Sequence, residues 1–190
     1  MIKIKDIIFK DETYNLYESE ITEDIILFIK KVFKKNYDAD VNYFQKKFLL
    51  LLKNGQIVSL IGYQSLSDSK VLIENYTKKP LEKTLNLLVK REKIIEIGNL
   101  SSSENGLGQY IIYLLIEHLR LKDYEWVFLT APEKVLNLMS RFKLNFKKIV
   151  EAKISDLDET QIYNWGSYYE QKPFVIALDI SKNKQILNNL

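Results

Sequence analysis

The side chain best suited to move a proton is a glutamate inside an apolar segment. Residues 93–99, KIIEIGN, alternate as a β-strand does, with Ile95 and Ile97 on one face and Glu96 and Gly98 on the other. An ionised carboxylate there is costly unless it faces a polar cleft, and partial burial raises its pKa towards neutral pH. Glu96 is therefore the first candidate for a general base; the alternative is a residue that faces solvent or pairs with a lysine.

A second acidic residue, Glu74, stands near the end of the apolar stretch 72–76, LIENY. A carboxylate at this place could take a proton or bind an ammonium group. The alternative is a surface residue at the end of a strand. Glu74 is therefore the second candidate for the base.

A turn rich in serine and glycine follows the strand 93–99 and leads into an apolar helix. Gly106 and Gly108 remove side chains just where the N–H groups and the dipole of a helix N-terminus attract anions. We therefore expect an anion site at Leu107, Gly108 and Gln109. The turn lacks the Gly-Lys-Ser/Thr of a P-loop and the spacing of a dinucleotide fingerprint. A plain tight connection between strand and helix is the alternative.

Composition excludes several kinds of chemistry. The chain has no cysteine, which rules out disulfides, thiolate metal sites and a cysteine nucleophile. Its single histidine, His118, falls on the helix after the glycine-rich turn, where we expect it at the surface. One histidine without partners does not make a histidine-based metal site, so no metal site is predicted.

Length and charge indicate one folded domain. The 190 residues are 46% hydrophobic and 28% charged, with a net charge of +3, and the lysines are scattered. The densest lysine run, within 30–35, fits a solvated helix face better than a nucleic-acid or lipid surface. No signal peptide is visible, and the longest apolar run, 48–52, is too short to span a membrane. We expect a cytoplasmic protein with no nucleic-acid partner and no stable membrane insertion.

Hydrophobic periodicity and turn residues predict the elements that must position these side chains. The predicted strands and extended segments are 3–9, 48–52, 57–64, 71–76, 93–99, 126–130, 146–150 and 174–180. The predicted helices are 21–33, started by Thr22 or Ser19, then 80–90 with Leu81, Leu85, Leu88 and Val89 inward, then the helix after Gly108 and one that follows Pro132. Asn54-Gly55 should turn the hairpin between 48–52 and 57–64.

This order predicts an α/β (α+β) fold, a central mixed sheet with helices on both faces. The strands 93–99 and 125–130 are joined by one helical crossover and should be parallel neighbours. We expect a single domain over residues 1–180 and a frayed C-terminal tail over 181–190.

Several short motifs carry a family resemblance, and their order is characteristic: YDADV at 37–41, IENY at 73–76, EIGNL at 96–100, the GLG turn, WVF at 126–128, RFKL at 141–144 and WGSYY at 165–169. From about residue 37 to 180 the sequence resembles the bacterial thermostable hemolysin family. EIGNL and WGSYY are the most specific pieces. That family is similar to the GNAT fold, and within it to acyl-homoserine lactone synthases and long-chain N-acyl amino acid synthases.

The resemblance implies a central sheet that is partly splayed between the strands 93–99 and 125–130. An acyl thioester would lie between them, with its phosphopantetheine phosphates at the turn before the helix, near Leu107, Gly108 and Gln109. Asn99, Ser101, Ser102 and the backbone N–H of Leu100 would donate hydrogen bonds to the thioester carbonyl or the pantetheine amides. The alternative for these is that serine and asparagine are ordinary turn residues.

The implied activity is transfer of an acyl chain, expected to be a fatty one, from acyl-CoA or an acyl-carrier protein to a small amine, by direct transfer and with no permanently bound cofactor. Glu96, or else Glu74, would serve as base. Trp165, Ser167 and Tyr169 would line the acyl or acceptor pocket, and Tyr168 would protonate the leaving thiolate. Aromatic clusters are also common in cores, which is the alternative for this group.

Two positions depart from related sequences. Gln109 stands where relatives tend to have arginine, and Tyr63-Gln64 stands where they tend to have a basic residue. The loss of positive charge favours the single phosphodiester of an acyl-carrier protein over the pyrophosphate of CoA, with surface lysines meeting the acidic face of that partner. Two other functions remain as alternatives: a membrane-active hemolysin, and a GNAT-fold binding protein without catalytic activity.

Overall fold

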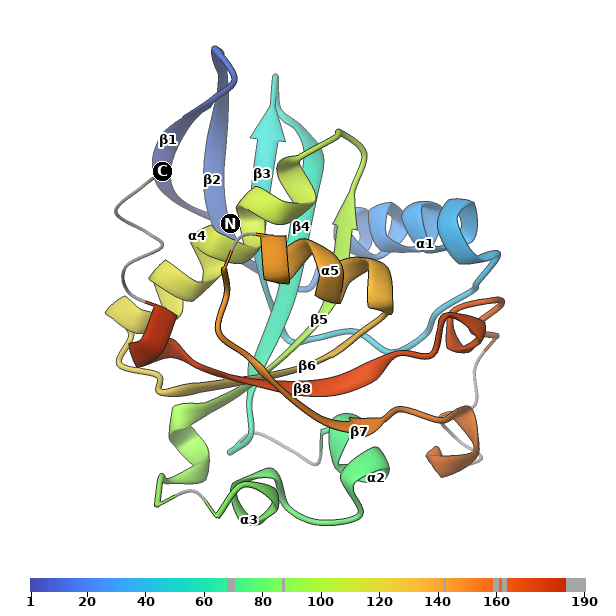
Figure 1. Ribbon diagram of the computed structural model, residues 1–190. Coiled ribbons are helices and arrows are strands. Elements are labelled where there is room, and N and C mark those ends of the chain that lie inside the picture. Colours follow the sequence, from blue (N-terminus) through green and yellow to red (C-terminus); the bar gives the residue numbers. More distant parts are fainter. Residues whose placement is uncertain (68–70, 87, 142, 159–160, 162–163, 184–190) are drawn as a thin grey trace.

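The computed structural model describes residues 1–67, 71–86, 88–141, 143–158, 161 and 164–183. One mixed sheet of eight strands runs through the molecule in the order β1-β2-β3-β4-β5-β6-β8-β7 (Figure 1). The strands are β1 Ile2–Phe9, β2 Glu12–Glu20, β3 Lys47–Lys53, β4 Gln56–Ser65, β5 Ile94–Ser102, β6 Trp126–Ala131, β7 Lys147–Glu151 and β8 Phe174–Asp179. The α-helices are α1 Glu23–Tyr37, α2 Ile73–Thr77, α3 Leu81–Thr84, α4 Leu107–Leu121 and α5 Glu133–Arg141.

Helices cover both faces of the sheet, as predicted. Residues of α4 and α5 pack into one apolar core, and residues of α1 and α2 pack into a second core on the opposite face. In Figure 1, α4 and α5 lie in front of the sheet and α1 behind it. β3 is buried on both faces because it lies between these layers. This explains why its residues Phe48–Leu52 are all apolar.

The local signals in the sequence give the expected elements at several places. Thr22 caps α1, since its hydroxyl oxygen accepts a hydrogen bond from the Ile25 N–H. Asn54 and Gly55 both have positive φ and turn the β3–β4 hairpin. β5 and β6 are parallel neighbours joined through α4, as the crossover argument requires.

The central strands are splayed. β5 and β6 pair only from Ile94 opposite Trp126 to Ile97 opposite Leu129. β5 then continues to Ser102 and β6 to Ala131, with no further pairing between them. Just past the splay, three steps along β5 from Gly98 to Ser101 oppose two steps of β4, which makes a β-bulge.

The segment 71–76 was wrongly predicted as a strand. Residues Ile73–Thr77 form the short helix α2, and Ile73 and Tyr76 turn into the core. Three consecutive apolar residues, Val71 to Ile73, do not separate a buried strand from a buried helix, so the sequence could not decide between them. The tertiary contacts of the Ile73 N–H, described below, hold the helix in place.

The helix predicted over 80–90 is also too long. α3 ends at Thr84, and Asn86 adopts a left-handed φ of 52° that stops the helix. Leu81 is buried as expected, but Leu88 is fully exposed. The sequence does not predict the strand β2, because its buried hydrophobic residues, Tyr14 and Leu16, alternate over too short a stretch.

The segment 181–190 was expected to be a frayed tail, but its first residues pack against the rest of the protein. Asn183 is 1% exposed, and its side-chain nitrogen donates to the carbonyl of Asn145 at 3.1 Å. Its side-chain oxygen accepts from the Asn145 N–H at 2.8 Å. Residues 184–190 of the predicted tail lie outside the described residues.

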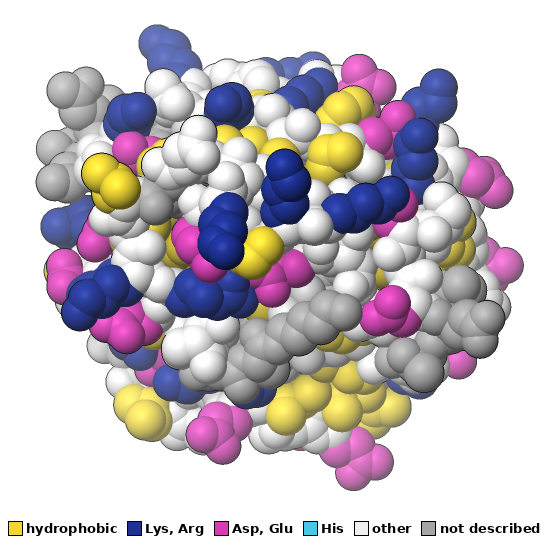
Figure 2. Space-filling view, turned by 90° about the horizontal axis from the view of Figure 1, so that it is seen from below, with side chains coloured by type: hydrophobic (Ala, Val, Ile, Leu, Met, Phe, Trp, Pro, Cys, Tyr) yellow, Lys and Arg dark blue, Asp and Glu magenta, His cyan; other side chains and the backbone are white. Residues whose placement is uncertain are grey.

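The surface beyond α2 and α3 carries charges of both signs. Figure 2 shows this face from below, with lysine and arginine side chains interspersed among acidic ones. Lys90 pairs with Glu92, and Lys78 pairs with Asp156. Such an arrangement creates no single-sign field over this face.

Candidate active site

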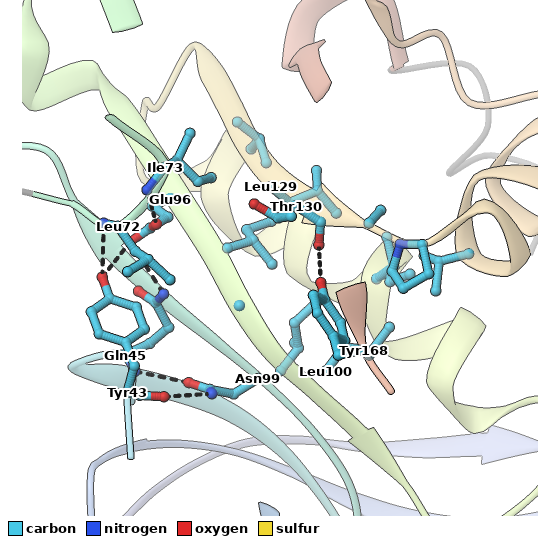
Figure 3. Close-up of a pocket in the computed structure, with 18 of the residues that line it drawn as sticks. Tyr43, Gln45, Leu72, Ile73, Glu96, Asn99, Leu100, Leu129, Thr130 and Tyr168 are labelled. Atoms are coloured by element: carbon cyan, nitrogen blue, oxygen red, sulfur yellow. Dashed lines mark hydrogen bonds between the residues drawn. The ribbon is translucent and has the colours of Figure 1, made fainter. Parts of the chain in front are cut away.

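A cavity opens where β5 and β6 separate. It has a volume of about 180 Å³ and reaches both faces of the sheet, because residues of both apolar cores line it. On the α4 and α5 side its wall is aliphatic: Ile97, Leu100, Ile112, Ile116, Leu129 and Met139. On the α1 and α2 side it is aromatic and polar: Phe33, Tyr37, Tyr43, Gln45, Tyr76, Glu96, Trp165, Tyr168 and Tyr169. Figure 3 shows the labelled members around the opening.

Glu96 lies at the wall of this cavity and is only 2% exposed. Its Oε2 accepts hydrogen bonds from the Tyr43 hydroxyl at 2.8 Å, the Gln64 amide at 2.8 Å and the Gln45 amide at 3.2 Å. Its Oε1 accepts one from the backbone N–H of Ile73 at 3.1 Å. Burial raises the pKa of Glu96, and the four hydrogen bonds oppose that rise. The alternative of a solvent-facing or lysine-paired carboxylate is therefore wrong.

Gln45 sits against the backbone of β4 and β5. A Cβ on Gly62 would lie 2.7 Å from the Gln45 Cβ, and one on Gly98 would lie 2.8 Å from its Nε2. Only glycine at both positions leaves room for this side chain, which is 2% exposed. Its Nε2 donates to Glu96, whereas its Oε1 has no hydrogen-bond partner among the described residues. The Gln45 amide thus brings an unused acceptor to the wall of the cavity.

Asn99 has a structural task. It adopts a left-handed φ of 52° at the β5 bulge, a conformation that asparagine tolerates. Its Oδ1 accepts from the Gln45 N–H at 2.9 Å, and its Nδ2 donates to the Tyr43 carbonyl at 3.0 Å (Figure 3). The Asn99 amide therefore holds the segment that carries Tyr43 and Gln45, instead of being free to bind a thioester.

Of the other predicted hydrogen-bond donors, one lines the cavity and two do not. Leu100 lines the cavity. Ser101 does not line it; this residue is 1% exposed, and its carbonyl accepts from the Ser59 hydroxyl at 3.4 Å. The Ser102 hydroxyl donates to the Glu104 carbonyl at 2.9 Å, within the turn before α4. Only Leu100 therefore remains positioned to contact a ligand in the cavity.

Three aromatic residues of the segment 165–169 form one wall of the cavity. Trp165 and Tyr168 are buried, and Tyr169 pairs its hydroxyl with that of Tyr76 at 2.6 Å. The Tyr168 hydroxyl donates to the Thr130 carbonyl at 3.2 Å, on the β6 side of the splay (Figure 3). These three side chains are brought together as predicted, and they belong to both core and cavity.

Ser167 does not reach the cavity. Its backbone N–H and its hydroxyl both donate to the carbonyl of Tyr37, at 2.8 and 3.2 Å. This double contact fixes the segment 165–169 to the end of α1. The expected substrate contact of Ser167 is replaced by this anchoring.

Glu74 is likewise outside the cavity wall. Its carboxylate accepts two hydrogen bonds from the Arg91 guanidinium, at 2.7 and 3.1 Å, and one from the Leu81 N–H at 3.2 Å. Arg91 also pairs with Glu82 at 2.8 Å. The Glu74 carboxylate therefore joins α2 to α3 and the segment before β5, and we do not retain it as a base.

The N-terminus of α4 has the backbone that an anion site needs. Gly106 precedes the helix with φ of 93° and provides no side-chain cap, and the first turn contains no acidic residue. Leu107 is buried, and Gly108 and Gln109 are partly exposed. Lys10 of the β1–β2 turn lies nearby, with its Nζ 3.5 Å from the position that a Cβ on Gly106 would take. These residues do not line the cavity, but they directly follow β5.

Three site residues were missed by sequence reasoning: Tyr43, Gln45 and Gln64. Tyr43 lies in a segment that looks like a plain polar loop, and Gln64 was regarded only as a loss of positive charge. A polar residue at the end of the apolar run 57–64 was the available signal for Gln64. Tyr43 and Gln45 gave no such signal, because the residues that they contact, among them Gln64, Leu72, Glu96 and Asn99, are distant in sequence.

His118 is not the surface residue that was expected. Its side chain is 13% exposed and contacts Glu18 at 3.2 Å. Glu18 also accepts hydrogen bonds from Tyr63 and from Lys122, the latter at 2.6 Å. These contacts lower the pKa of Glu18 to about 2, whereas burial lowers the pKa of His118. The cluster joins α4 to β2 and β4, away from the cavity.

Comparison with known families decides the relationship. The sequence model of one family, described as thermostable hemolysin, matches residues 17–184. The chain belongs to the thermostable hemolysin family. This membership agrees with the resemblance seen in the motifs. A comparison with curated proteins finds no match.

Solved structures share the fold of this thermostable hemolysin family member. The AHL synthase LasI matches with a TM-score of 0.56 at 12% identity, covering 88% of this chain and 91% of LasI. The CoA-dependent acyl-homoserine lactone synthase BjaI, with SAM and isopentyl-CoA, matches with a TM-score of 0.60 at 11% identity, over 92% and 86%. FeeM, an N-acyl amino acid synthase from uncultured soil microbes, matches with a TM-score of 0.61 at 8% identity, over 90% and 94%. The GNAT-like fold predicted from the sequence is confirmed.

The family name suggests an action on membranes. In the part of the chain that the structure describes, none of the helices has both the length and the apolar character needed to cross a bilayer.

Proposed function

We propose that this protein is an N-acyltransferase that moves an acyl chain, most simply a fatty one, from a thioester to an amine by direct transfer. The observation that carries the proposal is Glu96, an almost fully buried carboxylate at the wall of a cavity between two splayed strands. The fold, shared with synthases that transfer acyl groups, supports the same class of reaction.

The donor would lie between β5 and β6, where pairing has ended. The aliphatic wall that includes Ile112, Ile116 and Met139 suits an acyl chain. The N-terminal turn of α4, at Leu107, Gly108 and Gln109, suits the donor phosphate because its N–H groups have no side-chain cap.

The amine would approach from the aromatic wall, beside Glu96. Glu96 takes a proton from the ammonium group, and the freed nitrogen lone pair attacks the thioester carbon. The carbonyl oxygen becomes an oxyanion, to which the backbone N–H of Leu100, a residue of the cavity wall, would donate a hydrogen bond. Collapse of this intermediate breaks the C–S bond, and the thiolate leaves with a proton from Tyr168. The nitrogen, which still carries two protons, releases one to solvent and becomes the neutral amide. Tyr168 is reprotonated from solvent, and Glu96 loses its proton to solvent.

The carrier of the acyl chain is either CoA or an acyl-carrier protein. Gln109 is neutral, and this favours the single phosphodiester of a carrier protein over a pyrophosphate. The solved structure of BjaI is described as that of a CoA-dependent synthase, and therefore acyl-CoA is the second candidate donor. Both carriers therefore belong in the test.

The test is mass spectrometry and thiol release with the purified protein, acyl-CoAs and acyl-carrier proteins of graded chain length, and a mixture of amines. N-acylated product that forms with wild type and is lost in Glu96→Gln is the expected result. Donor binding without any turnover would instead support a binding protein with a GNAT-like fold. Lysis of cells by protein without any acyl donor, equal to that with donor, would support a direct hemolysin.

A further inference from the structure

The charge of the cavity wall discriminates between amine acceptors. Among the described residues that line the cavity, Glu96 is the sole carboxylic acid, and lysine, arginine and histidine do not occur. The wall near Glu96 consists mainly of aromatic rings: Phe33, Tyr37, Tyr43, Tyr76, Trp165, Tyr168 and Tyr169. The site thus offers one negative charge and aromatic surfaces, without a cationic side chain.

A substrate carboxylate would be poorly accommodated in this wall. It would be buried without a counterion and close to the carboxylate of Glu96, and both effects disfavour its charged form. The tyrosine hydroxyls are neutral donors and do not supply the missing positive charge. Tyr43 already donates to Glu96, Tyr168 donates to Thr130, and one hydroxyl of the Tyr76–Tyr169 pair donates to the other. A free amino acid therefore fits this site badly.

An ammonium group is well accommodated at the same place. Gln45 Oε1 is a buried acceptor at the wall with no partner among the described residues. Within the described part of the chain, Glu96 Oε1 accepts one hydrogen bond, from Ile73, and a carboxylate oxygen can accept another. Aromatic faces attract both cations and aromatic rings. Two acceptor oxygens and a surrounding aromatic wall match an R–NH₃⁺ group with an aromatic body.

We infer that the acceptor is an arylalkylamine that carries no carboxylate, and that its ammonium group binds between Gln45 Oε1 and Glu96. This inference rests on the proposed acyltransferase function and narrows its substrate class. It differs from the acceptor class named for FeeM, an N-acyl amino acid synthase.

The test compares tyramine, L-tyrosine methyl ester and L-tyrosine, which differ in the carboxylate. Each amine is incubated with wild-type protein and with the acyl-CoA or acyl-carrier protein that gives turnover, and the N-acylated product is quantified by mass spectrometry. We expect kcat/KM for tyramine and for the ester to exceed that for L-tyrosine by about tenfold or more. Equal or better use of L-tyrosine would overturn the inference and leave the acyltransferase function intact.

Isothermal titration without donor separates the two proposals. Binding of tyramine but not of L-tyrosine, with no product from any donor, would support the amine site and contradict the acyltransferase function. Binding of L-tyrosine as tight as that of tyramine, or no binding of any of the three, would contradict the amine site.

Variants test the role of Gln45. Gln45→Met removes the acceptor oxygen at similar size, and we expect it to raise the tyramine dissociation constant about fivefold or more. Gln56→Met, on the exposed end of β4, is the matched control and should leave that constant unchanged. An unchanged constant in folded Gln45→Met would overturn the assignment of Gln45. Should Gln45→Met fail to fold, as judged by circular dichroism, the comparison of amines with wild type decides by itself.

Discussion

Glu96 accepts a hydrogen bond of 2.8 Å from the hydroxyl of Tyr43, a residue 53 positions earlier in the chain. The same hydroxyl accepts from the Gln64 amide at 2.8 Å, so a strand, its neighbour and a loop meet at one carboxylate. Burial raises the pKa of Tyr43 as well, which keeps this hydroxyl a donor. A buried carboxylate held in this way is poised next to a cavity without being exposed to bulk water.

Replacement of Glu96 by glutamine should abolish turnover and leave the protein folded. Removing a general base costs about 10²–10⁴-fold in rate. The amide oxygen can keep the three donors that now bind Oε2, whereas the amide nitrogen would face the Ile73 N–H and lose that hydrogen bond. The free energy of unfolding should therefore fall by about 1–3 kcal/mol. Steady-state kinetics and denaturant unfolding measure the two effects.

Glu74→Gln is the matched control for Glu96→Gln. It removes a carboxylate that pairs with Arg91 outside the cavity wall. We expect it to lower stability by about 1–3 kcal/mol and to leave kcat/KM within about threefold of wild type. Loss of turnover in Glu74→Gln with retention in Glu96→Gln would reverse the assignment of the base.

The pH dependence should report the raised pKa of Glu96. A base must be deprotonated, so kcat/KM should fall as pH drops through a pKa that lies above the ordinary carboxylate value of 4.5. Stability has the opposite sign: the folded state holds the Glu96 proton more tightly than the unfolded chain, so this contribution is lost as pH rises through the folded pKa. Wild type should therefore lose stability relative to Glu96→Gln over this window. A pH profile in which kcat/KM falls only at or below pH 4.5 would contradict the assignment of Glu96 as the base.

Gly108→Ala separates stability from donor binding. A Cβ there would lie 3.4 Å from the Ser102 Cβ, an ordinary contact, and alanine is favoured over glycine in a helix by about 1 kcal/mol. The melting temperature should rise by about 2–4 °C. The added methyl group would obstruct a phosphate at the start of α4, so the KM for the donor should rise. An unchanged KM for the donor together with raised stability would show that the donor phosphate does not bind at this turn.

Gln109→Arg should act in the opposite direction on the same site. A cation in the first turn of α4 would pair with the donor phosphates and tighten acyl-CoA binding, most strongly at low salt. Titration of acyl-CoA at two ionic strengths measures this effect. Gln109→Met, which adds no charge, is the control and should bind as wild type does.

Gly166→Ala should destabilise the aromatic wall. Gly166 has φ of 51°, and a Cβ there would lie 1.9 Å from the Tyr37 carbonyl oxygen, so the backbone must move. We expect a loss of about 2–4 kcal/mol in unfolding free energy. Gly55→Ala is the control: φ is 77°, but nothing lies within 4 Å of the added atom, and about 1 kcal/mol should be lost. Equal losses would show that the contact with Tyr37 is unimportant.

Local patterns in the sequence were sufficient for the framework of the molecule. Alternation over 93–99 placed Glu96 on the face opposite Ile95 and Ile97, and Asn54-Gly55 specified the hairpin turn. The single crossover between the strands that became β5 and β6 fixed them as parallel neighbours. These features depend on residues that are close in sequence or on a general rule of chain handedness, so no distant partner had to be known.

The surroundings of Glu96 were decided only by the tertiary structure. Tyr43, Gln45 and Gln64 come from a loop and another strand, and Asn99 and two glycines, Gly62 and Gly98, fix the place of Gln45. Glu74 lost its candidate role because Arg91, 17 residues away, takes its carboxylate. A single sequence gives the type of each side chain but not its distant partners, and the partners determine whether a carboxylate is a base, an anchor or a surface charge.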